Sequence, residues 1–128
     1  MPTAFRLTLK DAPGALAHVA AALAKRGINL EGSGAETAGG EGRVTLLTSD
    51  LEATREVLEG HNVTYEEVEL LVVTLQDNPG ALASVAQRLG EAGVNILSMV
   101  QLNRMHGRTD LGLVVDEPGK ARPVLGED

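Results

Sequence analysis

The sequence contains no cysteine and no tryptophan, and Phe5 and Tyr65 are its only phenylalanine and tyrosine. Without cysteine, disulfides, thiolate zinc sites and cysteine nucleophiles are all excluded. The shortage of aromatic side chains leaves no stacking platform for single-stranded nucleic acid. A formal net charge of −7 also opposes binding to a phosphate backbone. We therefore expect no nucleic-acid partner.

Long apolar runs are absent as well. No run approaches the roughly 20 residues that a membrane-spanning helix needs. The first residues, Met1 to Arg6, lack the basic and apolar regions of a signal peptide. These absences predict a soluble cytoplasmic protein with no membrane partner.

No catalytic or metal-binding pattern is found in the sequence. His18, His61 and His106 are the only histidines, and none has a histidine at the equivalent position of the repeat described below or a nearby metal-ligand partner. A nucleophile elbow, a P-loop and a dinucleotide fingerprint are also missing. We therefore expect no enzyme activity, no cofactor and no metal.

The chain does contain an internal repeat. Shifted by 66 positions, Leu7 to Leu30 aligns without a gap to Val73 to Ile96, and 13 of the 24 positions are identical. This identity indicates two copies of one structural unit. We place the first domain at residues 1–69 and the second at residues 70–128.

Each copy begins with the pattern of a strand followed by a helix. Apolar residues alternate with polar ones over residues 5–9 and recur in the same phase over residues 71–75, which is typical of half-buried strands. After Asp-x-Pro-Gly, apolar residues recur at the spacing of one buried helix face. These residues are Leu16, Val19, Ala20 and Leu23 in the first copy, and Leu82, Val85, Ala86 and Leu89 in the second.

The remaining patterns complete an α+β fold. Second strands begin at Ile28 and Val94, third strands are expected over residues 44–49 and 109–115, and short helices over about residues 51–59 and 118–125. Residues 63–68 then form a fourth strand in the first copy alone. The order βαββαβ followed by βαββα predicts two ferredoxin-like units in tandem, each an antiparallel sheet with its helices on one face. We therefore expect the second unit to lack its last strand and to be truncated at its C-terminal end.

Both copies carry Asp-x-Pro-Gly-Ala-Leu, the apolar helix stripe and Gly-Ile/Val-Asn-Leu/Ile. These motifs resemble the ACT domain family, and the whole chain is similar to stand-alone tandem ACT-domain proteins. The resemblance implies a regulatory module that binds a small amino acid at domain interfaces and takes part in control of amino-acid metabolism. It identifies neither the amino acid nor a regulated enzyme.

The resemblance also implies a ligand site at the turn from first strand to first helix, beside the start of the second strand. The prolines suit a first helical position, and the glycines let a ligand approach the backbone. Free N–H groups of the first helical turn would face a carboxylate, the aspartates an ammonium, and the asparagines both ends of the ligand. The candidate ligand-binding residues are Asp11, Ala12, Pro13, Gly14, Ala15, Leu16, Asn29 and Leu30 in the first copy, and Asp77, Asn78, Pro79, Gly80, Ala81, Leu82, Asn95 and Ile96 in the second.

Purely structural roles are open for the same residues. Pro-Gly is common at turns, and Asp11 and Asn78 could cap their helices. Asn29 and Asn95 could bond to local backbone at the start of a strand. The alternative function is accordingly a ligand-free interaction module that uses the same fold to join subunits.

The two copies differ in their second strands and at their ends. Five glycines between residues 32 and 42 predict a short or irregular strand in the first copy, which favours the second copy as the ligand site. In the second copy the missing last strand leaves residues 71–75 without a neighbouring strand on one side. Further apolar residues alternate with those that face the helices and therefore fall on the opposite side of the sheet. They suggest that the non-helical face of this unit is covered, and they are Val72, Leu97, Met99 and Val114. We therefore expect a homodimer.

Overall fold

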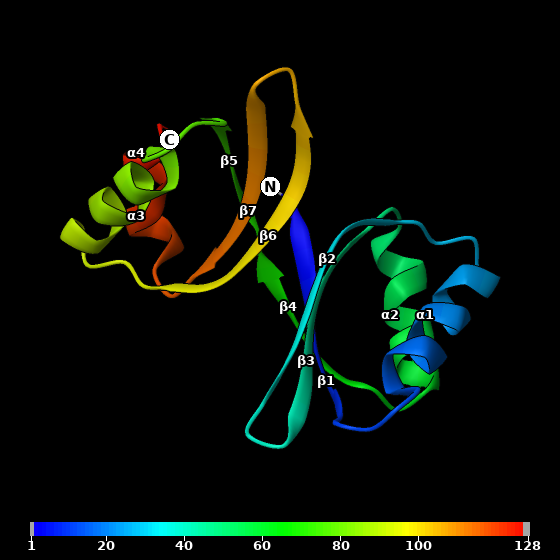
Figure 1. Ribbon diagram of the computed structural model, residues 1–128. Helices are drawn as coiled ribbons and strands as arrows, with labels where there is room; N and C mark the ends of the chain where they lie inside the picture. Colours follow the sequence, from blue (N-terminus) through cyan, green and yellow to red (C-terminus); the bar gives the residue numbers. More distant parts are fainter. Residues whose placement is uncertain (1, 127–128) are drawn as a thin grey trace. The chain divides into compact units, whose positions relative to one another are not determined.

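The computed structural model describes residues 2–126, which form two compact units (Figure 1). One unit comprises residues 3–68, and the other comprises residues 69–126 together with Pro2. The elements of the first unit are β1 (Thr3–Lys10), α1 (Ala15–Lys25), β2 (Leu30–Ala38), β3 (Glu41–Thr48), α2 (Leu51–Gly60) and β4 (Thr64–Glu69). Those of the second are β5 (Leu71–Gln76), α3 (Ala81–Glu91), β6 (Ile96–Met105), β7 (Arg108–Val115) and α4 (Pro118–Val124).

The sheets have the expected ferredoxin-like topology. The first sheet has the strand order β2-β3-β1-β4, so its last strand lies beside its first. The second has the order β5-β7-β6. Within residues 2–126 it has no fourth strand, and β5 is therefore an edge strand. The predicted fold class is confirmed, including the missing strand of the second unit.

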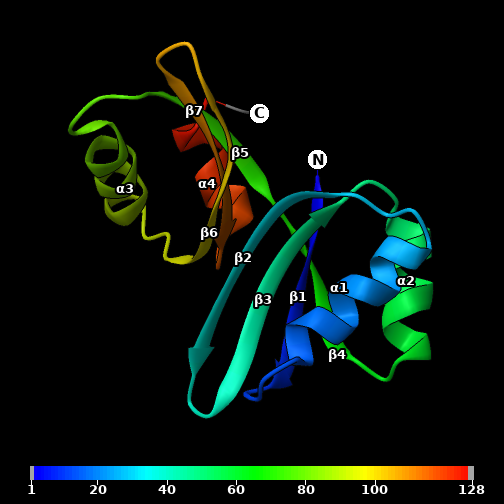
Figure 2. The same ribbon diagram turned by 45° about the vertical axis from the view of Figure 1, so that its right-hand side comes forward.

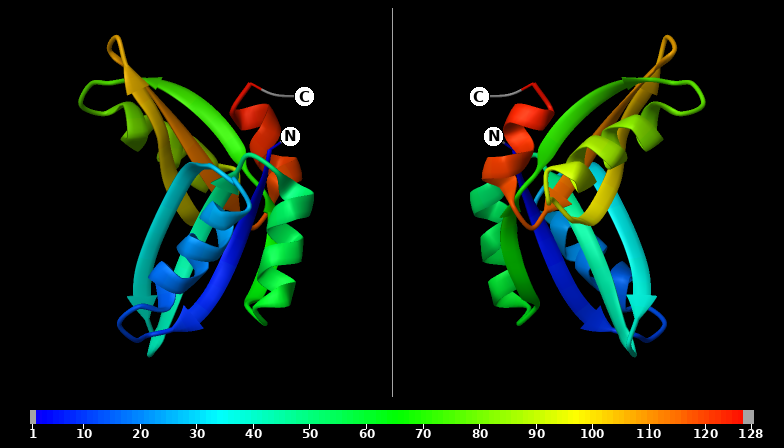
Figure 3. Two further views of the ribbon diagram at one scale, coloured as in Figure 1. Left: turned by 90° about the vertical axis from the view of Figure 1, so that its right-hand side faces the viewer. Right: turned by 90° about the vertical axis from the view of Figure 1, so that its left-hand side faces the viewer.

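In each unit both helices cover one face of the sheet (Figures 2 and 3). In the first unit, alternate residues of β1 and β3 meet one stripe of each helix. This core comprises Phe5, Leu7, Val19, Leu23, Ile28, Val44, Leu46, Val57 and Leu58. The second unit repeats the arrangement with Leu71, Val85, Leu89, Val94, Leu111, Leu113, Val115 and Ala121.

The predicted helix stripes are only partly buried. Val19 and Leu23, and their equivalents in α3, are buried as expected. Leu16 and Leu82, at the start of each stripe, are 44% and 40% exposed, so their predicted burial is wrong. Both leucines lie in the first turn of their helices, next to the strand-to-helix turn.

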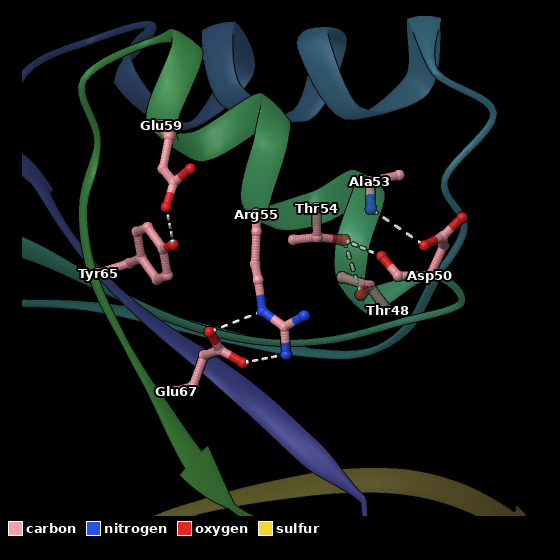
Figure 4. A network of polar contacts seen from close by, with 8 residues as sticks. All are labelled: Thr48, Asp50, Ala53, Thr54, Arg55, Glu59, Tyr65 and Glu67. Carbon is pink, nitrogen blue, oxygen red and sulfur yellow. Dashed lines mark hydrogen bonds and ion pairs between the residues drawn. The ribbon is translucent and has the colours of Figure 1, made fainter.

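Polar contacts fix the start of α2 on its sheet (Figure 4). The Asp50 side chain caps the helix by accepting a hydrogen bond from the Ala53 N–H at 3.0 Å. The buried hydroxyls of Thr48 and Thr54 lie 2.9 Å apart, and the Thr54 hydroxyl donates to the Asp50 carbonyl at 2.6 Å. These bonds satisfy polar groups that would otherwise be buried without partners.

Two further contacts in Figure 4 connect α2 to β4. The Arg55 guanidinium donates two hydrogen bonds to the Glu67 carboxylate, at 2.7 and 2.8 Å. This bonding lowers the pKa of Glu67 below its usual value and raises that of Arg55. The Tyr65 hydroxyl donates to Glu59 at 3.0 Å, while desolvation is the main cause of the raised pKa of Tyr65.

The glycine-rich strand β2 is longer than predicted. It pairs with β3 from Leu30 to Ala38, with one register shift between Leu30 and Gly32. The apolar strand β6 has two such shifts. Strand β2 is therefore irregular, as one of the two expected alternatives, but it is not short. Because β6 contains more register shifts than β2, this feature no longer favours the second unit as the ligand site.

The first register shift in β6 also changes which residues share a face. Beyond this shift Met99 pairs directly with Leu113, whose side chain lies in the core. Directly paired residues point to the same side of a sheet, so Met99 lies on the helical face of the second sheet. The prediction that Met99 lies on the non-helical face is therefore wrong. Val114 is buried, whereas Leu97 and Met99 are about half exposed.

Candidate functional site

The two strand-to-helix turns have the same backbone geometry. Gly14 and Gly80 occupy the N-cap positions with φ of 84° and 89°, a left-handed conformation that favours glycine. The helices begin one residue later, at Ala15 and Ala81. The prolines therefore precede the N-cap rather than occupy the first helical position, as the sequence had suggested.

Among the side chains that the structure describes, none caps α1 or α3. Both N-caps lack a side-chain hydrogen bond. Asp11 therefore does not cap α1, and the Asn78 amide instead donates to Gln76 at 3.1 Å. The capping interpretation of these two residues is thus wrong.

The first turn of α1 presents free backbone donors. Ala15 N–H donates to the Ala12 carbonyl at 3.2 Å, and regular helical bonding begins with His18 N–H to Gly14 at 2.9 Å. Within the described chain, the N–H groups of Leu16 and Ala17 have no protein acceptor. Such groups, at the positive end of the helix dipole, form a favourable environment for an anion.

A pocket of about 240 Å³ lies at this turn in the first unit. Its walls come from β1, the turn, the start of α1, and the adjoining parts of β2 and β3. Apolar residues form most of the lining, and Lys10, Asp11 and Glu36 supply one positive and two negative groups. The lining residues are Leu9, Lys10, Asp11, Ala12, Ala15, Leu16, Ala35, Glu36, Thr37, Gly42 and Val44.

Four of the predicted site residues line this pocket, namely Asp11, Ala12, Ala15 and Leu16. The sequence interpretation missed Lys10, Glu36 and Thr37. Lys10 directly precedes the motif, but Glu36 and Thr37 reach the site only through strand pairing, because β2 aligns with β3 and β3 with β1. Counting back from the Gly39-Gly40 turn was the one signal in the sequence that could have identified them.

The turn of the second unit differs in its contacts. Arg104 of β6 donates a hydrogen bond from Nε to Asp77 Oδ2 at 2.6 Å, and this bond raises the pKa of Arg104. Asp77 N–H also donates to the Gly107 carbonyl at 2.7 Å. Asp11 forms no ion pair or hydrogen bond through its side chain to any described residue.

A hollow of about 470 Å³ lies at the β6–β7 hairpin of the second unit. It contains none of the predicted site residues; Thr74, Asn103, Met105, His106, Arg108 and Asp110 line it.

The two asparagines lie at the other end of their sheets. Asn29 exchanges two hydrogen bonds with Ser49, from Asn29 N–H to Ser49 Oγ and from Ser49 N–H to the Asn29 carbonyl, each at 3.0 Å. Asn95 and Asp116 make the same exchange at 2.8 and 3.1 Å. These bonds use the backbone of each asparagine, and both residues are exposed.

One unit therefore does not bring its turn and its asparagine together. A strand rises roughly 3.3 Å per residue, so Asn29 and Glu36 lie roughly 23 Å apart along β2. The neighbours of the asparagines also differ, since Leu30 is 37% exposed whereas Ile96 packs against the second core. The prediction that the turn lies beside the start of the second strand is wrong within a single unit.

Two histidines do lie side by side, contrary to the expectation that each stands alone. The rings of His18 and His61 are edge-to-face, with centroids 5.3 Å apart. Within residues 2–126, however, no group of three or more potential ligands could hold a metal ion. None of the helices in that range has the length and apolar character needed to cross a bilayer.

Comparisons with known proteins agree with this fold. Residues 5–60 match the family model described as the AHAS small subunit-like ACT domain. No curated protein matches the chain. A crystal structure of a Bacteroides thetaiotaomicron protein is similar over 98% of this chain and 86% of that chain, with a TM-score of 0.85 and 22% identity.

Regulatory subunits of aspartate kinase share the same fold. The ligand-free form from Thermus thermophilus has a TM-score of 0.65 and 20% identity, over 97% of this chain and 89% of that chain. The subunit from Thermus flavus has a TM-score of 0.67 and 18% identity, over 98% and 92%. The family match covers the first unit, and the second unit repeats its motif and topology. The first unit therefore matches an ACT domain, and the whole chain shares the fold of these proteins.

Proposed function

We propose that this chain is a non-catalytic regulatory module that binds a small amino acid at the β1–α1 turn of its first unit. The observation that carries the proposal is the pocket lined by Lys10, Asp11 and Glu36, next to the free N–H groups of α1. With about 240 Å³, it is smaller than the roughly 300–1,000 Å³ clefts that hold drug-sized ligands. A small metabolite suits this size.

The charges of the pocket match those of a free amino acid. The ligand carboxylate would accept hydrogen bonds from the N–H groups of Leu16 and Ala17, with the Lys10 ammonium as a further positive group. The ligand ammonium would face Asp11 and Glu36. The remaining lining is mainly aliphatic, which favours a ligand with a small or apolar side chain.

The exposed asparagine amides fit the same proposal through a second copy of the chain. Because Asn29 lies roughly 23 Å from the turn of its own unit, its amide would contact a ligand held at a turn of another copy. This arrangement agrees with ligand binding at domain interfaces, which the family resemblance implies.

Isothermal titration calorimetry with the twenty amino acids tests the proposal. Asp11→Asn should weaken binding of the ligand so identified roughly ten- to hundredfold, because a hydrogen bond to a charged group is worth about 1.5–3 kcal/mol. Glu31→Gln removes one charge at the far end of β2 and should leave binding unchanged. Equal affinities of the Asp11→Asn variant and the parent protein would reject this site.

The absence of binding by every amino acid at millimolar concentration would favour the alternative, a ligand-free module that joins subunits. Control of an enzyme of amino-acid metabolism, the lack of catalytic activity and the cytoplasmic location remain predictions. A pull-down with an aspartate kinase or acetolactate synthase catalytic chain, with and without the amino acid, would test the regulatory part.

A further inference from the structure

We propose that Arg104 closes the second strand-to-helix turn to amino acids, so that the chain has one ligand site and not two. The inference rests on the proposed function of the first turn and concerns the difference between the units. At the first turn the Asp11 carboxylate has no partner among the described residues, whereas at the second the Asp77 carboxylate holds the Arg104 guanidinium.

Strand pairing identifies the residue that Arg104 replaces. In the first unit Thr37 pairs with Gly42, one row before the Ala38–Glu41 pair that closes the β2–β3 hairpin. In the second unit Arg104 pairs with Thr109, one row before the Met105–Arg108 pair. Thr37 and Arg104 are therefore structural equivalents.

The extra residue at the second register shift of β6 hides this equivalence in the sequence. The repeat offset of 66 residues pairs Arg104 with Ala38. After the shift the offset is one residue larger, and Arg104 instead pairs with Thr37, a lining residue of the first pocket.

The difference between the Thr37 and Arg104 side chains explains why the second turn would be closed to amino acids. Thr37 has a short neutral side chain that leaves Asp11 free to receive an ammonium group. Arg104 brings a permanent positive charge to the carboxylate, with Nε and Oδ2 2.6 Å apart. A tethered cation acts at an effective concentration on the order of millimolar, so a free amino acid must compete with it for the same carboxylate.

The test places at each turn the residue found at the other, with the variants Arg104→Thr and Thr37→Arg. The probe is whichever of the twenty amino acids binds the parent protein, and calorimetry gives the number of ligands per chain. We expect one for the parent protein and two for Arg104→Thr. Thr37→Arg should abolish binding at the first turn, and Arg104→Lys, which keeps the charge, should retain one ligand per chain.

Two ligands per chain in the parent protein, or one in Arg104→Thr, would overturn the proposal. If no amino acid binds any variant, the proposed function has failed, and the contact itself is then tested by nuclear magnetic resonance. The Arg104 Nε–H signal should be protected from exchange and lose that protection in Asp77→Asn. Unchanged exchange of the Arg104 Nε–H in that variant would reject the Arg104–Asp77 contact independently of any ligand.

Discussion

Gly112 shows how closely the second unit is packed at a single residue. A Cβ added to this glycine of β7 would lie 2.8 Å from the nearest side-chain carbon of Leu70, which is 1% exposed. Gly112→Ala should therefore lower the free energy of unfolding by roughly 1–3 kcal/mol, the usual cost of an overpacked core. Urea denaturation measures the change.

Gly90→Ala is the matched control in the same unit. A Cβ at Gly90 of α3 meets nothing within 4 Å, and the equivalent residue of α1 is Ala24. This substitution should stabilise the helix by roughly 0.5–1 kcal/mol. Equal effects of the two substitutions would contradict the packing assigned to Leu70.

The hydroxyl pair of Thr48 and Thr54 gives a second prediction at this scale. Thr54→Val keeps the shape but leaves the buried Thr48 hydroxyl without its partner, which should cost roughly 1–3 kcal/mol. Thr48→Val combined with Thr54→Val should recover most of this loss, since the second unit has Val115 and Ala121 at the equivalent positions. Thermal unfolding of the single and double variants measures these changes in stability. Additive losses would contradict the hydrogen bond between Thr48 and Thr54.

At the scale of residues, the sequence located the turn but not the whole pocket. The repeated motif identified Asp11 and Leu16 because local spacing positions them. Glu36 and Thr37 depend on how three strands align, and that alignment cannot be read from periodicity. The exposure of Leu16 was missed because a helical stripe does not show where the sheet beneath it ends.

Among the elements, the attachment of β4 to α2 has a pH dependence with a definite sign. The Arg55 guanidinium lowers the pKa of Glu67 in the folded state. The ionised Glu67 carboxylate therefore stabilises the fold at pH values above its usual pKa of 4.5. That contribution is lost as the pH falls through the lowered value. Glu67→Gln should therefore be less stable than the parent protein near neutral pH, and the difference should shrink in acid.

Denaturation curves between pH 7 and pH 3 measure this difference. Glu31→Gln removes the same charge from a residue that forms no ion pair with any described residue. Its stability should follow that of the parent protein throughout. A Glu67→Gln difference that is constant with pH would contradict the assigned pairing.

The elements themselves were predicted well, because alternation and helical periodicity are local properties of the sequence. Within residues 2–126, the order of the eleven elements and the missing last strand of the second unit follow from them. The two register shifts of β6 were not predicted, and each of them conceals a feature of the second unit. The Ile96–Ser98 shift moved Met99 to the helical face, and the Gln101–Asn103 shift hid the equivalence of Thr37 and Arg104.

For the whole molecule, the homodimer expected from the sequence remains a prediction. The sequence placed the dimer contact at the edge over residues 71–75, which is β5, or on the non-helical face of the second unit. The structure adds a second edge strand, β6, whose Leu97 and Met99 are 47% and 46% exposed, and an apolar edge favours pairing with another chain. Sedimentation at micromolar concentration should give a dimer. Met99→Lys should shift it toward monomer, while Gln87→Lys on exposed α3 should not; a monomeric parent protein would refute the prediction.

Amide chemical-shift mapping with each amino acid is the strongest test of ligand binding at the first turn, because it locates the ligand as well as detecting it. With the amino acid that binds, the largest changes should fall on the N–H groups of Leu16 and Ala17 and on Glu36 of β2. The turn around Asp77 should change little. No changes with any of the twenty amino acids at millimolar concentration, or changes confined to the second turn, would contradict the account.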